Sequence, residues 1–122
     1  EAKGKLVALF GCGGERDPGK RQLMGAVAAT GADRVIVTDD NPRSEDPALI
    51  RAAIMAACPK SEEVTPRDKA ITKAINDLNS DDILLIAGKG HESVQLIGAE
   101  TLPFSDATVA SNAIHAMREA KQ

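Results

Sequence analysis

The sequence predicts an α/β fold in which a mostly parallel sheet of about six strands carries helices on both faces. Three short, nearly continuous apolar runs end abruptly at glycine or an acidic residue, as buried parallel strands do. These runs are Lys5–Phe10, Arg34–Thr38 and Asp82–Ala87. Helical stretches separate them, so strand and helix alternate along the chain.

The three helical stretches are expected at about Lys20–Thr30, Pro47–Ala57 and Pro66–Leu78. Pro47 and Pro66 occupy the first turn, where a missing backbone N–H is tolerated. Thr65 and Asp68 have the spacing of a capping box with aspartate in place of glutamate. Both features predict well-defined helix starts.

The remaining segments are shorter and complete the alternation. A weaker strand is expected around Glu62–Val64, and two short extended segments are expected at Val94–Ile97 and Glu100–Pro103. A last helix begins at about Asp106, with Ser105 as its N-cap. Counting all extended segments gives the expected six strands.

Length and composition limit the kind of protein. At 122 residues the chain predicts a single domain spanning residues 1–122. A net charge of −3 and an aromatic content of 2% argue against nucleic acid as a partner. Cys12 and Cys58 have no metal-type spacing, so we expect reduced cysteines in a cytoplasmic protein and no metal site. No apolar run is long enough to suggest a membrane span, and the start at Glu1 suggests a domain of a longer polypeptide.

Three unusual loops follow the three main strands. They cover Gly11–Arg21, Asp39–Arg43 and Gly88–Glu92. In open α/β sheets the ligand lies beyond the carboxyl ends of the strands, where such loops converge. We therefore expect the three loops to form one pocket.

The second loop contains Asp40-Asn41-Pro42-Arg43 and suits a ligand that carries both charges. Pro42 fixes its own φ and favours an extended Asn41, so the flanking side chains leave the backbone in fixed directions. Arg43 offers a planar fork for a carboxylate, and Asp40 can accept from an ammonium group. A zwitterionic amino acid fits this pattern. The alternative is a solvated Asn-Pro turn with a surface arginine.

The first loop departs from both standard phosphate-binding motifs. Arg16 stands where a dinucleotide fingerprint needs its third glycine, and Arg21 stands where a P-loop needs serine or threonine for Mg²⁺. What remains is a glycine turn that presents Arg16, Lys20 and Arg21 near a helix N-terminus, which favours an anion. Lys20 and Arg21 are therefore candidate nucleotide or phosphate contacts.

The third loop combines close backbone approach with an acceptor. Gly88 and Gly90 remove Cβ obstruction beside a ligand, and Glu92 can accept from an ammonium group. Lys89 and His91 are more typical of solvated or structural side chains.

Four segments in order resemble the C-terminal domain of the Mur ligases: FGCGGERDPGKR, TDDNPR, Arg67 ahead of the third helix, and IAGKGHE. The similarity is to the MurE type, which adds meso-diaminopimelate to UDP-MurNAc-L-Ala-D-Glu in peptidoglycan synthesis. It implies a Rossmann-like domain and no catalytic residue within it. The diaminopimelate site that it implies consists of Arg16, Asp40, Asn41, Pro42, Arg43, Gly88 and Glu92.

The resemblance also implies partners and cofactors outside this chain. The complete enzyme would bind ATP and Mg²⁺ mainly through a central domain and the UDP-linked dipeptide through other domains, in the bacterial cytoplasm. None of these cofactors is expected on this fragment, which would be inactive alone. Ser93-Val94-Gln95 and Phe104–Ala107 depart from the common family pattern at the edge of the site.

Two other modules are alternatives. A phosphoryl receiver would use Asp39, Asp40 and Lys89, but the run through Val64 ends without a phosphoacceptor aspartate. A nucleotide-binding Rossmann-like module is disfavoured by Arg16 and Arg21.

Overall fold

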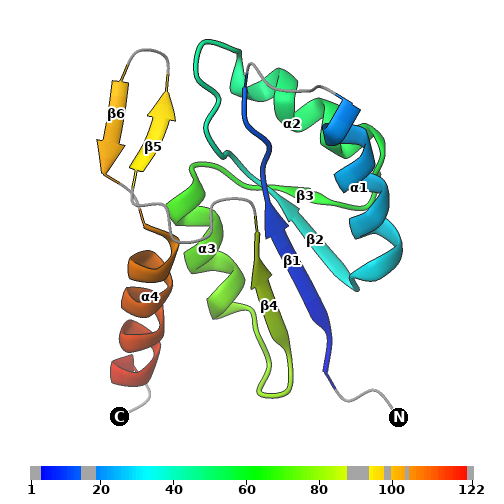
Figure 1. The fold of residues 1–122 in the computed structure, drawn as a ribbon. Helices are drawn as coiled ribbons and strands as arrows, with labels where there is room; N and C mark the ends of the chain where they lie inside the picture. The colour runs from blue at the N-terminus through cyan, green and yellow to red at the C-terminus, as the bar shows by residue number, and fades with distance from the viewer. Residues whose placement is uncertain (1–3, 15–18, 88–93, 98–99, 104, 121–122) are drawn as a thin grey trace.

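The computed structural model describes residues 4–14, 19–87, 94–97, 100–103 and 105–120. The chain forms an α/β fold, as the sequence predicts (Figure 1). The elements in order are β1 (Leu6–Phe10), α1 (Gly19–Gly31), β2 (Arg34–Val37), α2 (Pro47–Ala56), β3 (Glu62–Glu63), α3 (Arg67–Asn76), β4 (Ile83–Ile86), β5 (Val94–Ile97), β6 (Glu100–Pro103) and α4 (Asp106–Ala120).

The main sheet has four strands in the order β3-β2-β1-β4, and all its pairings are parallel. The prediction of about six strands in one sheet is wrong, because β5 and β6 pair only with each other as an antiparallel hairpin. Two residues separate these strands in the sequence, and so short a connection suits antiparallel neighbours, whereas parallel strands need a long crossover. In Figure 1 the hairpin stands apart from the sheet.

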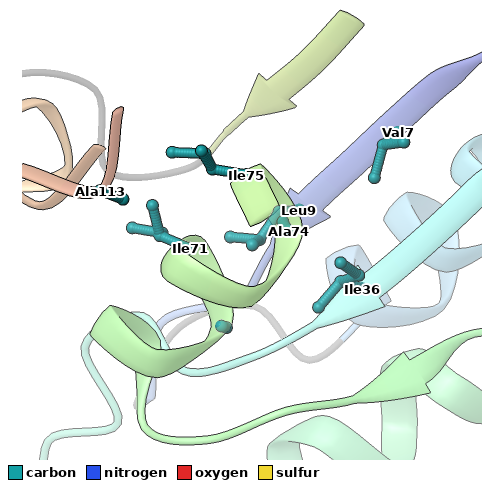
Figure 2. Close-up of a cluster of buried hydrophobic side chains, with 8 residues drawn as sticks. Val7, Leu9, Ile36, Ile71, Ala74, Ile75 and Ala113 are labelled. Carbon is teal, nitrogen blue, oxygen red and sulfur yellow. The ribbon is translucent and has the colours of Figure 1, made fainter. Parts of the chain in front are cut away.

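Helices cover both faces of the sheet, as predicted, because side chains alternate between the faces along each strand. Val7, Leu9 and Ile36 pack with α3 and with Ala113 of α4 in one buried cluster, shown in Figure 2. A second buried cluster on the opposite face joins β1 and β2 to α2, with partly buried side chains of α1 against it. The two clusters together hold the strands whose carboxyl ends carry the loops.

The helix starts agree only in part with the predictions. Asp46 caps α2 by accepting a 2.9 Å hydrogen bond from the Ala48 N–H, and Pro47 lies in the first turn as predicted. The capping box before α3 is wrong: α3 begins at Arg67, and Pro66 is an extended N-cap with no side-chain capping bond. The Asp68 carboxylate accepts from the neighbouring Lys69 N–H instead. The predicted Ser105 cap of α4 is confirmed, since Ser105 Oγ accepts from the Thr108 N–H at 3.3 Å.

Strand β4 is an edge of the sheet with two unlike faces. Leu84 and Ile86 pack against the cluster under α3, whereas Ile83 and Leu85 are exposed on the other face. The exposed face borders an apolar groove that continues onto α1. Among the described helices, none is both long and apolar enough to cross a lipid bilayer.

Candidate functional site

The carboxyl ends of β1, β2 and β4 lie side by side, and the three predicted loops begin there. The structure describes residues 11–14 and 19–21 of the first loop, the whole of the Asp39–Arg43 loop, and the third strand end as far as Ala87. Arg16, Gly88 and Glu92 lie outside the described residues, so their membership of the site stays a prediction.

The first two loops are joined through their backbones. The Gly14 N–H donates to the Asn41 carbonyl at 2.7 Å. Arg43 Nη1 donates to the Gly14 carbonyl at 3.0 Å and to the Asn41 carbonyl at 3.2 Å. A Cβ added at Gly14 would collide with the Pro42 carbonyl oxygen, so only glycine permits this approach. The structure therefore brings together two of the three loops that the sequence assigns to one site.

Arg43 has a backbone φ of 53°, in the left-handed region that non-glycine residues rarely adopt. Such a conformation persists where the surroundings hold it, and it is typical of functional loops. Here the two hydrogen bonds from Nη1 hold the loop and set the direction of the half-buried guanidinium. Asn41 and Pro42 are buried, so the loop is packed against the fold and is not a solvated turn.

The two candidate phosphate contacts at the start of α1 differ in environment. Arg21 is buried; its Nη2 donates to Glu45 Oε1 at 2.8 Å and to the Gly13 carbonyl at 3.4 Å. Lys20 is exposed. Burial raises the pKa of the nearby Cys12 thiol, and the positive charge of Arg21 partly opposes that rise. Arg21 therefore has internal partners, and Lys20 is the exposed cation of the two.

Asp39, the first residue of the acidic pair Asp39–Asp40, is also integrated into the fold. Arg51 donates to Asp39 Oδ1 at 2.6 Å and to Glu63 Oε2 at 2.6 Å, so Asp39 is held against α2 and β3. Within the described parts of the chain, no group of three or more His, Cys, Asp or Glu side chains could hold a metal ion.

Arg67 is a prominent polar residue of this region to which the sequence analysis assigned no role. Its side chain is fully buried at the start of α3. Nε and Nη2 donate to the two carboxylate oxygens of Asp106, each at 2.7 Å. Nη1 donates to the Asp39 carbonyl at 2.8 Å, and Nη2 also donates to the Ala87 carbonyl at 3.3 Å. A sequence signal for its burial does exist, because Arg67 begins the helical stripe that continues through Ala70, Ile71 and Ala74.

Comparison with known proteins places this geometry in a family. A family model described as "Mur ligase, glutamate ligase domain" matches residues 1–90. The chain belongs to the Mur ligase family. This confirms the resemblance carried by the glycine-rich, DNPR and GKGHE segments.

Several similar proteins carry the same name. The UDP-N-acetylmuramoyl-L-alanyl-D-glutamate--2,6-diaminopimelate ligase of Rickettsia rickettsii is 55% identical over 112 residues, which cover 90% of this chain and 23% of that protein. The ligase of the same name from Bradyrhizobium diazoefficiens is 58% identical over 105 residues, covering 86% of this chain and 22% of that protein. A solved structure of a ligase of this name matches with a TM-score of 0.88 and 42% identity, over 93% of this chain and 24% of that one. The chain thus spans less than a quarter of the length of these relatives.

Proposed function

We propose that this chain is the amino-acid-binding domain of an ATP-dependent ligase that joins meso-diaminopimelate to UDP-N-acetylmuramoyl-L-alanyl-D-glutamate in cell-wall synthesis. The observation that carries the proposal is the Asp40–Arg43 loop, held rigidly at the carboxyl end of β2 by the first loop. The names of the relatives support the choice of substrate.

The residues of the loop suit the two ends of a zwitterion. Arg43 offers its guanidinium fork to a carboxylate of the amino acid, and Asp40 accepts from an ammonium group. Pro42 and the buried Asn41 keep these two side chains in fixed directions. Arg16, Gly88 and Glu92 complete the proposed site from the other loops. The domain contributes by orienting the attacking amine of diaminopimelate, without proton transfer by its own side chains.

The described start of α1 does not fit the magnesium site of a P-loop. Arg21 stands at the P-loop position that needs a hydroxyl ligand, and its guanidinium is paired with Glu45. We therefore assign the binding of ATP and Mg²⁺ mainly, and that of the UDP-linked dipeptide, to parts of the ligase outside this chain. Lys20, which is exposed, remains the better candidate for a phosphate contact.

The alternative of a phosphoryl receiver is less well supported. Such a module holds Mg²⁺ with an acidic cluster, whereas Asp39 is engaged by Arg51 at 2.6 Å. The proposed amino-acid site needs no metal ion of its own.

The test is the selectivity of the ligase that carries this chain between meso-diaminopimelate and L-lysine, which differ by one carboxylate. Arg43→Ala is expected to cost about 1.5 to 3 kcal/mol, the worth of a hydrogen bond to a charged group, or about ten- to a hundredfold in kcat/KM for diaminopimelate. The weak activity with lysine is expected to change much less. The control is Arg34→Ala, which removes the same charge at the opposite end of β2. Equal losses for both amino acids would refute the role of Arg43.

A further inference from the structure

We propose that Arg67 is a positioning residue that fixes the spacing between the Asp39–Arg43 loop and the end of β4. The inference rests on the proposed function, because the loops that it spaces are those assigned to the amino acid. Arg67 itself is fully buried, so it acts through the backbone and does not touch the ligand.

The strand order sets the distance that Arg67 spans. β2 and β4 flank β1 on opposite sides, so their ends lie about 9 to 10 Å apart, two strand spacings. The Thr38 N–H donates to the Phe10 carbonyl, and the Ala87 N–H donates to the Leu9 carbonyl, each at 2.9 Å. Arg67 adds a further contact that joins these two strand ends.

The single guanidinium of Arg67 bridges the ends of β2 and β4 across β1. Nη1 holds the Asp39 carbonyl, directly before Asp40, and Nη2 holds the Ala87 carbonyl, directly before Gly88. Because both contacts are to main-chain oxygens, they fix where each loop begins whatever its side chains do. The planar fork of arginine can satisfy acceptors on several sides at once, whereas a lysine ammonium on a flexible stem cannot reproduce the arrangement.

Asp106 compensates the buried positive charge of Arg67 and fixes the orientation of its guanidinium. Both of its carboxylate oxygens accept from Arg67 at 2.7 Å, and the exposed fractions of the two side chains are 0% and 7%. Asp106 is the first residue of α4, where the helix dipole also favours a negative charge. The plane of the guanidinium is thereby set by α4, and the remaining donors are aimed at the two loop origins.

The test uses the ligase that carries this chain and compares Arg67→Lys with the matched control Arg34→Lys. Arg34 also makes a two-point contact with a carboxylate, that of Glu62, but at the amino ends of the strands. Arg67→Lys is expected to lower kcat/KM for meso-diaminopimelate by about 10- to 100-fold through misplacement of the loops. The KM for the UDP-linked dipeptide should be unchanged, and Arg34→Lys should leave both quantities unchanged.

Each outcome decides the inference. A lower melting temperature of Arg67→Lys with an unchanged kcat/KM for diaminopimelate would show a purely structural role and overturn it. If Arg67→Lys does not fold, Asp106→Asn, which weakens the same pair without removing the arginine, carries the same expectation and the same refutation. Arg43→Ala separates the two proposals. An effect of Arg43→Ala without an effect of Arg67→Lys refutes this inference alone, and no effect of either refutes the proposed function.

Discussion

Two arginines at opposite ends of the sheet make nearly the same ion pair in different environments. Arg67, at the carboxyl ends of the strands, donates a hydrogen bond to each carboxylate oxygen of Asp106 at 2.7 Å. Arg34, at the amino end of β2, donates to the two carboxylate oxygens of Glu62 at 2.7 and 2.9 Å. It also donates to Asp77 at 3.2 Å. The exposed fractions are 0% and 7% for the first pair, but 26% and 41% for Arg34 and Glu62.

The difference shows that geometry alone does not set the importance of an ion pair. At the amino end, water can take over the contacts if one partner is removed, so the pair adds little. At the carboxyl end, removing one partner leaves a desolvated charge. Arg67 also binds main-chain carbonyls, whereas the partners of Arg34 are side chains. The buried Arg67–Asp106 ion pair therefore lies at the same end of the sheet as the proposed site.

The largest effect is expected from Arg67→Met in the unfolding of the chain. The substitution leaves the Asp106 carboxylate buried without its partner, which typically costs about 3 to 5 kcal/mol. The measurement is urea denaturation at pH 7, with Arg34→Met as the matched control, for which we expect less than about 1 kcal/mol. Similar losses for the two variants would contradict the contrast between the ends.

A smaller effect is expected from Gly14→Ala, which tests the joint between the first two loops. The new Cβ would collide with the Pro42 carbonyl oxygen, and the required shift should destabilise the fold by about 1 to 3 kcal/mol. Gly31→Ala, at the end of α1, is the control, because nothing lies within 4 Å of its added Cβ. Denaturation midpoints that move equally for both would show that the loops are not packed as described.

The next effect concerns whether the loops share one ligand. In the ligase, a double-mutant cycle of Arg16→Ala with Glu92→Gln should give a coupling of about 0.5 kcal/mol or more in diaminopimelate binding, because each loss leaves the same ligand incompletely paired. Calorimetric titration of the four proteins measures it. Strict additivity would place the two residues on separate sites.

The smallest effect is expected at the amino end and depends on pH. Hydrogen bonds lower the pKa of two carboxyl groups, that of Glu62 through Arg34, and that of Asp77 through Lys73 first and Arg34 second. Because these pKa values are lower in the folded chain than the ordinary 4.5 and 3.8, the stabilisation is present at neutral pH. It is lost as the pH falls below about 4.5.

Arg34→Gln should remove part of this dependence. Since both carboxyl groups are exposed, the difference between variant and wild type should be only ~0.3 kcal/mol at pH 7 and should vanish in acid. Urea denaturation at several pH values measures the difference. If the difference in unfolding free energy grew as the pH fell, the two carboxylates would not be stabilised by Arg34 in the folded chain.

The sequence predicted most of the fold and the meeting of the first two loops, for physical reasons. Continuous apolar runs identify β1, β2 and β4. Strands buried on both faces must be apolar throughout, and this reason holds for β1 and β2, whereas β4 is apolar throughout although Ile83 and Leu85 are exposed. The sequence does not separate the β5–β6 hairpin from the main sheet, because a short extended segment does not reveal its pairing partner. The role of Arg67 was hidden because its partners Asp39 and Asp106 lie 28 and 39 residues away in the sequence.

The most direct test of the central claim is hydrogen–deuterium exchange of the ligase that carries this chain, with and without meso-diaminopimelate. Peptides covering 11–14 and 39–43, at the carboxyl ends of the strands, should become protected. A peptide covering 76–82, at the amino ends, should not change, and L-lysine at the same concentration should protect far less. Protection of the 76–82 peptide alone, or equal protection by L-lysine, would contradict the assignment of a diaminopimelate site to the carboxyl end of this sheet.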